Sequence, residues 1–274
     1  MTINCKGNLV DLTIPKVMGI LNLTPDSFYA ESRNQPDTVL LNSAEKMLNE
    51  GATFLDLGGY STRPGAEDIG TAEEVKRVIP AVELLLKLFP DALISIDTFR
   101  SEVAHKSLEA GVAIINDISA GNLDENMLET VAKFNVPYVM MHMRGTPQTM
   151  TGLNSYENML QEILFYFSER INHARTFGMN DIIIDPGFGF SKNIAQNFEL
   201  LSNLEIFRNL NLPVLAGLSR KSTIYKTLGT TPEDALNGTT VLNTIALVKG
   251  ATILRVHDVK EAIEAVKLTG NLKN

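Results

Sequence analysis

The strongest constraint on the fold is a repeated alternation between short β-branched runs and longer stretches of helical periodicity. Such alternation builds a parallel sheet, because each helix returns the chain through a right-handed crossover to the next strand. We expect strands near residues 16–21, 53–57, 92–97, 112–116, 137–142, 181–185, 213–217 and 251–256. We expect helices near residues 38–49, 72–88, 100–109, 124–134, 155–177, 196–209, 233–249 and 259–268. About eight such units predict closure into a barrel.

Chain length and turn chemistry support this interpretation. A length of 274 residues is ordinary for a (β/α)8 TIM barrel, and we expect residues 1–274 to form one such domain. Gly51, Gly111, Gly178 and Gly250 each follow a helical run, where a left-handed backbone favours glycine. The first twelve residues, 1–12, have the pattern of a short hairpin, which we expect to cover the N-terminal mouth of the barrel.

Composition argues against a nucleic-acid or membrane partner and makes the cytoplasm the default location. The 24 Lys and Arg residues are outnumbered by 32 Asp and Glu residues, so the net charge is −8. An acidic surface does not attract nucleic acid or an anionic membrane, and neither is expected as a partner. Cys5 is the only cysteine, which excludes an internal disulfide and is compatible with a reducing compartment. No signal pattern or long apolar run suggests export or membrane insertion.

Polar side chains stand where several of the expected strands end. The C-terminal ends of parallel barrel strands meet on one face, so these residues should surround one pocket. Arg255 and His257 flank Val256 and should point to the same side, where two positive-capable groups suit a phosphate. Other expected strands end at Asn22, Asp97, Asn116 and Asp185.

Taken singly, each of these polar residues also has an ordinary structural interpretation. Asp97 and Asp185 need partners, which a ligand, a salt bridge or a helix N-terminus can provide equally well. Asn116 can bind the edge of a heterocycle or cap the next helix. Lys221 can act as a Schiff-base nucleophile, donate to a ligand or remain solvated. His142 is expected to be structural, since no second histidine stands at metal-binding spacing.

Four loops add to the expected active face. Residues 22–36 and 60–66 form unusually long connections after the first two barrel strands, which is typical of lids or substrate arms, although their composition also favours ordinary turns. Residues 187–190 and 217–222 contain glycines that would let a flat ligand approach the backbone, which by itself is weak evidence.

Taken together and in order, the sequence blocks resemble those of the dihydropteroate synthase family. They run along nearly the whole chain, and their ordered combination is much more specific than any single block. The blocks are Asn22–Phe28, Ser61–Gly65, Ser95–Thr98, Ile115–Ile118, Met141–Met143, Asp185–Phe190, Ser219–Ser222 and Arg255–Asp258.

The resemblance implies a transferase of folate biosynthesis. It would condense 6-hydroxymethyl-7,8-dihydropterin pyrophosphate with 4-aminobenzoate to give 7,8-dihydropteroate and pyrophosphate. The family mechanism is dissociative: the carbon–oxygen bond breaks before the amine attacks, which leaves a cationic pterin methylene. The resemblance also implies Mg²⁺ as cofactor, a homodimer, and a site that sulfonamides target in competition with aminobenzoate.

The resemblance further assigns roles to individual residues. Pterin binding is implied for Asp97, Asn116, Ile118, Met141, Asp185, Phe190, Gly217 and Lys221. Pyrophosphate binding is implied for Asn22, Arg63, Arg255 and His257, with Asn22 also the ligand of Mg²⁺. Aminobenzoate binding is implied for Phe28, Thr62, Arg63, Pro64, Gly189, Lys221 and Ser222. The residues expected to be catalytic are Asp97, Lys221, Arg255 and His257.

The sequence is also compatible with two other functions. A pterin-dependent methyltransferase barrel would share Asp97, Asn116 and Asp185, but it would not need the cationic residues of a pyrophosphate clamp. A catalytically silent pterin-binding paralogue would be expected to have lost loop or phosphate residues. One departure from the family pattern is Tyr60, which stands where the family commonly has an acidic residue before Ser-Thr-Arg-Pro-Gly.

Overall fold

The computed structural model, which describes residues 1–23, 36–61 and 68–273, has a closed parallel barrel at its centre. Its strands are β3 (Lys16–Asn22), β4 (Phe54–Gly58), β5 (Leu93–Asp97), β6 (Ile114–Asp117), β7 (Tyr138–Met141), β8 (Ile182–Asp185), β9 (Leu215–Ala216) and β10 (Ile253–Val256). The sheet order is β8-β7-β6-β5-β4-β3-β10-β9. A parallel bridge between Ile184 and Val214 joins the two ends of this order. The barrel predicted from the sequence is therefore confirmed.

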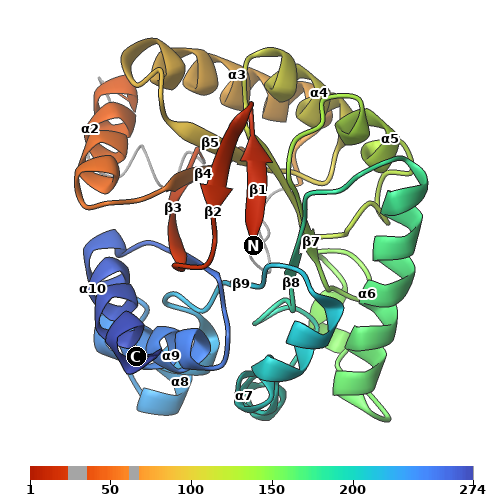
Figure 1. Ribbon diagram of the computed structural model, residues 1–274, viewed down its shortest axis with the longest axis vertical. Coiled ribbons are helices and arrows are strands. Elements are labelled where there is room, and N and C mark those ends of the chain that lie inside the picture. The colour runs from red at the N-terminus through yellow and green to blue at the C-terminus, as the bar shows by residue number, and fades with distance from the viewer. Residues whose placement is uncertain (24–35, 62–67, 274) are drawn as a thin grey trace.

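Helices surround the strands in a ring (Figure 1). They are α2 (Pro36–Asn49), α3 (Thr71–Leu88), α4 (Ser101–Glu109), α5 (Met127–Ala132), α6 (Met159–Thr176), α7 (Ile194–Ser202), α8 (Ser222–Leu228), α9 (Leu236–Val248) and α10 (Val259–Gly270). Three 3₁₀ turns follow Thr149, Asn203 and Gly270: Met150–Gly152, Leu204–Leu210 and Asn271–Lys273. Within the described part of the chain, none of the helices is both long and apolar enough to cross a bilayer.

The helices differ from the sequence-based prediction in two places. The single helix expected over 196–209 is divided at Asn203 into α7 and a 3₁₀ turn, and the Asn203 side chain donates to the carbonyl of Glu199 at 2.8 Å. Helix α8 was not predicted, because its seven residues are too few to establish a helical period. It begins directly after Lys221 and so fixes the backbone of a predicted site residue.

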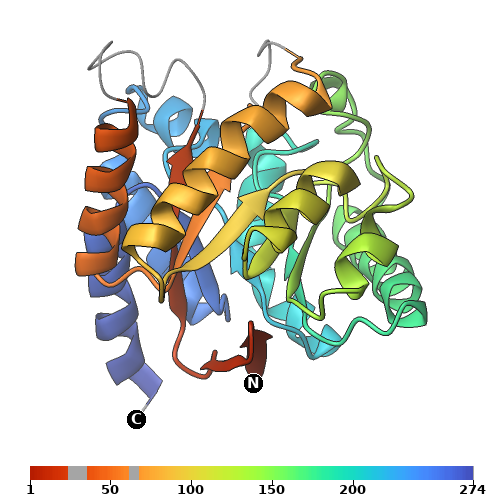
Figure 2. The ribbon, with the colours of Figure 1, turned by 90° about the horizontal axis from the view of Figure 1, so that it is seen from above.

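The N-terminal hairpin closes one end of the barrel, as expected. Strands β1 (Thr2–Cys5) and β2 (Asn8–Asp11) pair in antiparallel register through Lys6 and Gly7, both of which have positive φ. This conformation suits a tight hairpin turn. Figures 1 and 2 show the hairpin at the mouth where the barrel strands begin. Ile3, Cys5 and Leu12 pack there in one apolar cluster with the first inward-facing residues of the strands.

The barrel interior has an apolar lower layer and a largely polar upper layer. The lower layer contains Met18, Phe54, Ile114, Val139, Ile183, Leu215 and Ile253. Strand side chains alternate faces, so the residue two positions later on each strand also points inward. Those residues are Ile20, Asp56, Asn116, Met141, Asp185, Gly217 and Arg255. The period of two thus gathers the chemically active side chains at the carboxyl ends of the strands.

Candidate active site

A hydrogen-bonded cluster around Arg255 links four strands in the upper layer, namely β10, β4, β5 and β6. Its Nε donates to Asp56 Oδ2 at 2.6 Å, and its Nη2 donates to Asp97 Oδ2 at 2.6 Å. Asn116 Nδ2 donates to the same Asp56 oxygen at 3.2 Å. Charge-assisted bonds of this kind are stronger than neutral ones, so the guanidinium is held from two directions.

Burial and charge set the protonation of this cluster. Burial raises the pKa of Asp97, the nearby Arg255 opposes that rise, and Asp56 adds to it. Burial alone would lower the pKa of Arg255, but Asp56 and Asp97 hold it above its ordinary value. Asp56 is fully buried, and its Oδ1 has no hydrogen-bond partner among the described residues. A buried carboxylate oxygen without a donor is an acceptor site for a ligand N–H.

Asp185 and Lys221 form the other polar side of the site. Gly187 N donates to Asp185 Oδ1 at 2.8 Å, and the second carboxylate oxygen, Oδ2, lies beside Gly217. Burial raises the pKa of Asp185, and Lys221 opposes this shift. Burial lowers the pKa of Lys221 to about 8, and Asp185 opposes that.

Glycines keep the space around Lys221 open. A Cβ added at Gly217 would lie 3.8 Å from Lys221 Nζ and 3.9 Å from Asp185 Oδ2, so a longer side chain would stand between these two groups. At Gly189, where φ is +79°, an added Cβ would lie 3.1 Å from Lys221 Cδ. Lys221 Nζ donates to the carbonyl of Phe188 and lies 4.8 Å from the centre of the Phe190 ring. The site can therefore admit a flat polar ring beside the lysine.

An apolar wall lies beside these polar groups. It contains Ile118, Met141, Met143 and Met150, with Phe99, Leu123 and Phe190 packed against them. Ile118 belongs to a turn held by the buried Asp117, which accepts from Ser119 N at 2.7 Å and Gly121 N at 2.6 Å. An apolar wall next to convergent donors and acceptors is suited to a heteroaromatic ring.

The residues after β9 and β10 are fixed to one another. Ser219 Oγ lies 3.0 Å from His257 Nδ1 and also accepts from the His257 backbone N–H at 3.2 Å. Arg220 makes two bonds of 2.8 Å to the carboxylate of Asp258. These pairs hold Lys221 and His257 on adjacent rigid segments, and Ser222 begins α8 directly after Lys221.

Asn22 is the described residue that we predicted as a metal ligand. It ends β3 beside Gly58 of β4 in the sheet register. The described residues contain no group of three or more His, Cys, Asp or Glu side chains arranged to hold a metal ion. A single amide oxygen fits Mg²⁺ that keeps several waters and is bound mainly by substrate phosphates.

Four of the residues predicted to bind aminobenzoate or pyrophosphate belong to the two long connections, 22–36 and 60–66. Phe28, Thr62, Arg63 and Pro64 lie outside the described residues. Tyr60, which departs from the family pattern, is described: its hydroxyl accepts from Gln148 Nε2 at 2.6 Å and donates to Asp68 Oδ1 at 3.2 Å. Its ring packs edge-on against Phe99, with centroids 5.2 Å apart.

Sequence reasoning missed Asp56 and Lys192. An acidic residue within the apolar run Phe54–Gly58 was a signal for Asp56, because it stands two positions after an inward-facing residue. Lys192 gave no comparable signal, since it lies in a loop and its burial depends on tertiary contacts. His142, expected to be structural, is buried, and its Nδ1 lies 3.1 Å from Lys192 Nζ.

Comparison with known proteins gives a consistent result. The profile of the family described as "Pterin binding enzyme" matches residues 18–257. The dihydropteroate synthase of Escherichia coli K12 is 42% identical over 270 residues, which cover 98% of this chain and 95% of that protein. The Yersinia pestis dihydropteroate synthase, solved in complex with a sulfonamide drug, superposes with a TM-score of 0.93 at 39% identity, covering 100% of this chain and 99% of that one.

A second solved structure supports the same assignment. The Xanthomonas albilineans dihydropteroate synthase in complex with 7,8-dihydropteroate superposes with a TM-score of 0.89 at 34% identity, covering 100% of this chain and 99% of that chain. The likeness extends over the whole barrel and includes the segments that carry the site. The chain therefore belongs to the pterin-binding enzyme family, among the dihydropteroate synthases.

Proposed function

We propose that this protein condenses 6-hydroxymethyl-7,8-dihydropterin pyrophosphate with 4-aminobenzoate, forming 7,8-dihydropteroate and releasing pyrophosphate. The observation that carries the proposal is that Asp185, Lys221, Asn116 and the Asp56–Arg255–Asp97 cluster lie together at the carboxyl ends of the strands, beside one apolar wall. The relatives solved with a sulfonamide and with 7,8-dihydropteroate support the same substrate class.

The polar groups match the edges of a dihydropterin. Asp185 would accept from the 2-amino group and the N3–H with its two carboxylate oxygens, of which Oδ1 also accepts from Gly187 N. Asn116 and the unpartnered Oδ1 of Asp56 would satisfy further polar atoms of the ring. Lys221 would donate to the pterin acceptors, while Met141 and the rest of the apolar wall pack on the ring face.

The charged groups suit a dissociative reaction. As the carbon–oxygen bond breaks, its electron pair leaves with the pyrophosphate oxygen, and positive charge remains on the pterin methylene. Arg255 and His257 would stabilise the leaving group, and the carboxylate of Asp97 would face the cation. Bond formation by the amine of aminobenzoate then releases one proton from nitrogen. Fixed charges that lie where charge develops in the transition state usually make the largest single contribution to catalysis.

Mg²⁺ would neutralise the departing pyrophosphate when it is bound. The amide oxygen of Asn22 would be its protein ligand, with the pyrophosphate oxygens and water as the others. Asn22 ends the strand between β10, which carries Arg255, and β4. Chelation of Mg²⁺ should weaken binding of the pyrophosphate-bearing substrate and leave binding of a phosphate-free pterin unchanged, which calorimetry can measure.

Aminobenzoate would bind at the mouth of the site. Gly189, Lys221 and Ser222 are the described residues on that side, and Phe28, Thr62, Arg63 and Pro64 are proposed to complete it. We expect aminobenzoate and sulfonamides to bind well only after pyrophosphate or the pyrophosphorylated pterin. Titration of a sulfonamide with and without pyrophosphate and Mg²⁺ tests this order, and tight binding to the bare enzyme would contradict it.

We propose that two copies of the chain form a homodimer through the outer face of α9. Val241, Ile245 and Val248 stand at helical spacing and are 50%, 38% and 53% exposed, and Leu228 at the end of α8 is 59% exposed. Because an apolar stripe of this kind is covered in most proteins, a second copy of this chain is the proposed occupant. Val241→Lys should shift the protein toward monomer in sedimentation velocity, whereas Leu268→Lys on α10, 72% exposed, should not.

The cellular location is proposed to be the cytoplasm. Cys5 is buried and unpaired, which is compatible with a reducing compartment.

Pyrophosphate release from the dihydropterin substrate tests the proposed reaction directly. We expect release that depends on Mg²⁺, and formation of dihydropteroate when aminobenzoate is added. A silent paralogue would bind the pterin without releasing pyrophosphate, and a methyltransferase barrel would not respond to aminobenzoate.

A further inference from the structure

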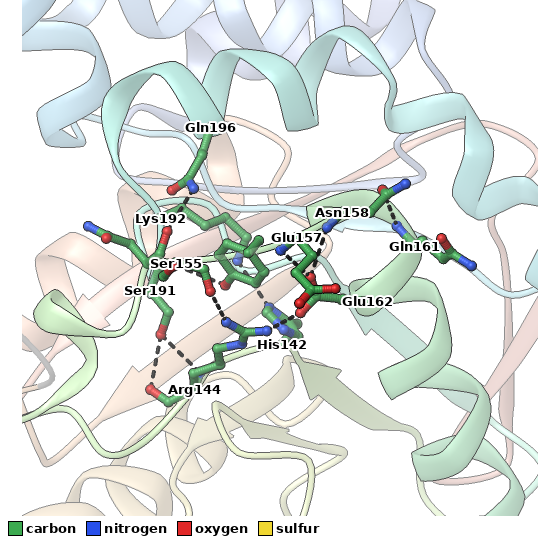
Figure 3. Close-up of polar contacts among 12 residues, drawn as sticks. His142, Arg144, Ser155, Glu157, Asn158, Gln161, Glu162, Ser191, Lys192 and Gln196 are labelled. Carbon is green, nitrogen blue, oxygen red and sulfur yellow. Dashed lines mark hydrogen bonds and ion pairs between the residues drawn. The ribbon is translucent and has the colours of Figure 1, made fainter.

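Lys192 is a buried cation whose ammonium group has only protein acceptors around it. The residue is 9% exposed and follows the loop that leaves β8. Its Nζ lies 3.0 Å from the carbonyl oxygen of Gly187 and 3.0 Å from that of Phe190. It also lies 3.1 Å from His142 Nδ1 (Figure 3). In its protonated form the group has three N–H donors, and these three contacts then account for its full hydrogen-bonding capacity.

Lys192 binds the loop after β8, which carries the predicted pterin-binding residues Asp185 and Phe190. The loop begins at Asp185 and ends with Phe190, whose ring lies 4.8 Å from Lys221 Nζ. Lys221 binds the carbonyl of Phe188, between the two carbonyls that Lys192 binds. Two lysines thus hold the loop, and the one that lies outside the proposed substrate contacts is Lys192.

The loop has little room to move. At Gly187, where φ is +75°, an added Cβ would lie 2.1 Å from the carbonyl oxygen of His142. Gly187 also donates its N–H to Asp185 Oδ1 at 2.8 Å. A displacement of Gly187 would therefore also displace the carboxylate of Asp185, which is proposed to bind the pterin.

Ser191 provides a second attachment next to Lys192. Its Oγ accepts from Arg144 N at 2.9 Å and donates to Arg144 O at 3.0 Å (Figure 3). Tyr156 Oη donates to the Ser191 carbonyl at 2.9 Å. The Arg144 guanidinium lies 3.8 Å from the Tyr156 ring centre and pairs with Glu162 of α6. The loop after β8 is therefore anchored to the segment after β7, and Lys192 is the buried amine in that contact.

We propose that Lys192 is a positioning residue for pterin binding: it holds the Gly187–Phe190 loop against His142 and so fixes the carboxylate of Asp185. This inference rests on the proposed function, because it concerns the pterin pocket. The role differs from general structural support, since it predicts a selective loss for the pterin and not for ligands held by other loops.

The test is Lys192→Met in the full chain, which keeps an unbranched side chain of slightly shorter length and removes the amine with its N–H donors. We expect the dissociation constant of a phosphate-free pterin to rise about tenfold to a hundredfold, because a small misplacement of a binding group has effects of that size. The dissociation constant of pyrophosphate with Mg²⁺ should change less than about threefold, because Arg255 and His257 lie on β10 and the loop after it. Lys133→Met removes an equal charge at a 64% exposed position and should change neither constant.

The controls separate the possible failures. Wild-type protein that binds no pterin would contradict the proposed function, whatever Lys192 does. Wild-type protein that binds pterin, with a folded Lys192→Met variant that binds it equally well, would overturn the positioning role alone. If Lys192→Met does not fold, Lys192→Arg keeps the charge but exchanges the compact ammonium for a planar fork. An equal loss of pterin and pyrophosphate affinity in the Arg variant would indicate general structural support and would also overturn the proposal.

Discussion

Arg255 on β10 and Asp56 on β4 meet above the intervening strand β3, with Arg255 Nε 2.6 Å from Asp56 Oδ2. The contact joins residues 199 positions apart in the chain. Arg255, which is proposed to stabilise the leaving pyrophosphate, is therefore held by the carboxylate of Asp56 and not by the substrate alone. Its position is set before substrate arrives.

Asp56→Asn should destabilise the fold. The substitution leaves Arg255 with one carboxylate fewer in a buried setting, and loss of one partner of a buried pair costs about 3 kcal/mol in free energy of unfolding. Chemical denaturation measures it. Asp68→Asn is the control, because Asp68 is 69% exposed and lies 3.6 Å from Arg100, so its loss should cost less than about 1 kcal/mol. Equal losses for the two variants would show that the Asp56–Arg255 contact contributes little.

Asp185→Asn should weaken pterin binding. The amide replaces one acceptor by a donor that faces the pterin N–H groups, and removal of a charged hydrogen-bond partner costs about 2 kcal/mol. Calorimetric titration with a pterin measures the loss. Asp234→Asn, at an exposed position before α9, should bind pterin like the wild type. Unchanged affinity in Asp185→Asn would remove Asp185 from the pterin pocket.

Gly187→Ala should abolish pterin binding through a steric clash. The new Cβ would lie 2.1 Å from the carbonyl oxygen of His142, so the β7 and β8 loops must separate. Gly229→Ala is a matched control, because Gly229 also has positive φ but has no atom within 4 Å of an added Cβ. The control should lose only about 1 kcal/mol of stability from the left-handed backbone and keep its pterin affinity. Similar behaviour of both variants in thermal unfolding and titration would contradict the close contact.

The pH dependence of stability should report the burial of Lys192. Burial, together with the nearby Lys221 and Arg144, lowers its pKa from 10.5 to about 7, and Asp185 opposes this shift. Between these values the unfolded chain binds a proton that the folded protein does not. The free energy of unfolding contributed by this residue therefore falls as pH is lowered toward 7.

Lys192→Met should show a shallower slope of unfolding free energy than the wild type between about pH 7 and pH 9, by linkage. Lys221 is present in both proteins, so its own contribution cancels in the comparison. The Cys5 thiol, whose pKa burial raises to about 12, stays protonated in the folded state across this range. Denaturant titrations at several pH values give the slopes, and parallel slopes would show that Lys192 keeps an ordinary pKa.

The sequence predicted the barrel and most of the site because both follow from local periodicity. Alternation of helix and strand implies a parallel sheet, and residues that end parallel strands must share one face. Asp97, Asn116, Asp185 and Arg255 could therefore be grouped although they are far apart in the chain. The same period of two includes Asp56, which stands two positions after the inward-facing Phe54.

Only the tertiary structure decided which partner each of these residues has. The sequence left Asp97 open to a ligand, a salt bridge or a helix cap, and the structure pairs it with Arg255 at 2.6 Å. Lys192 carries no periodic signal at all. Its burial and its three acceptors come from the contact between the loops after β7 and β8. Periodicity predicts which face of the sheet a side chain lies on and its level along the barrel axis. Its hydrogen-bond partners depend on the distance between segments that are far apart in the sequence, and no local pattern encodes that distance.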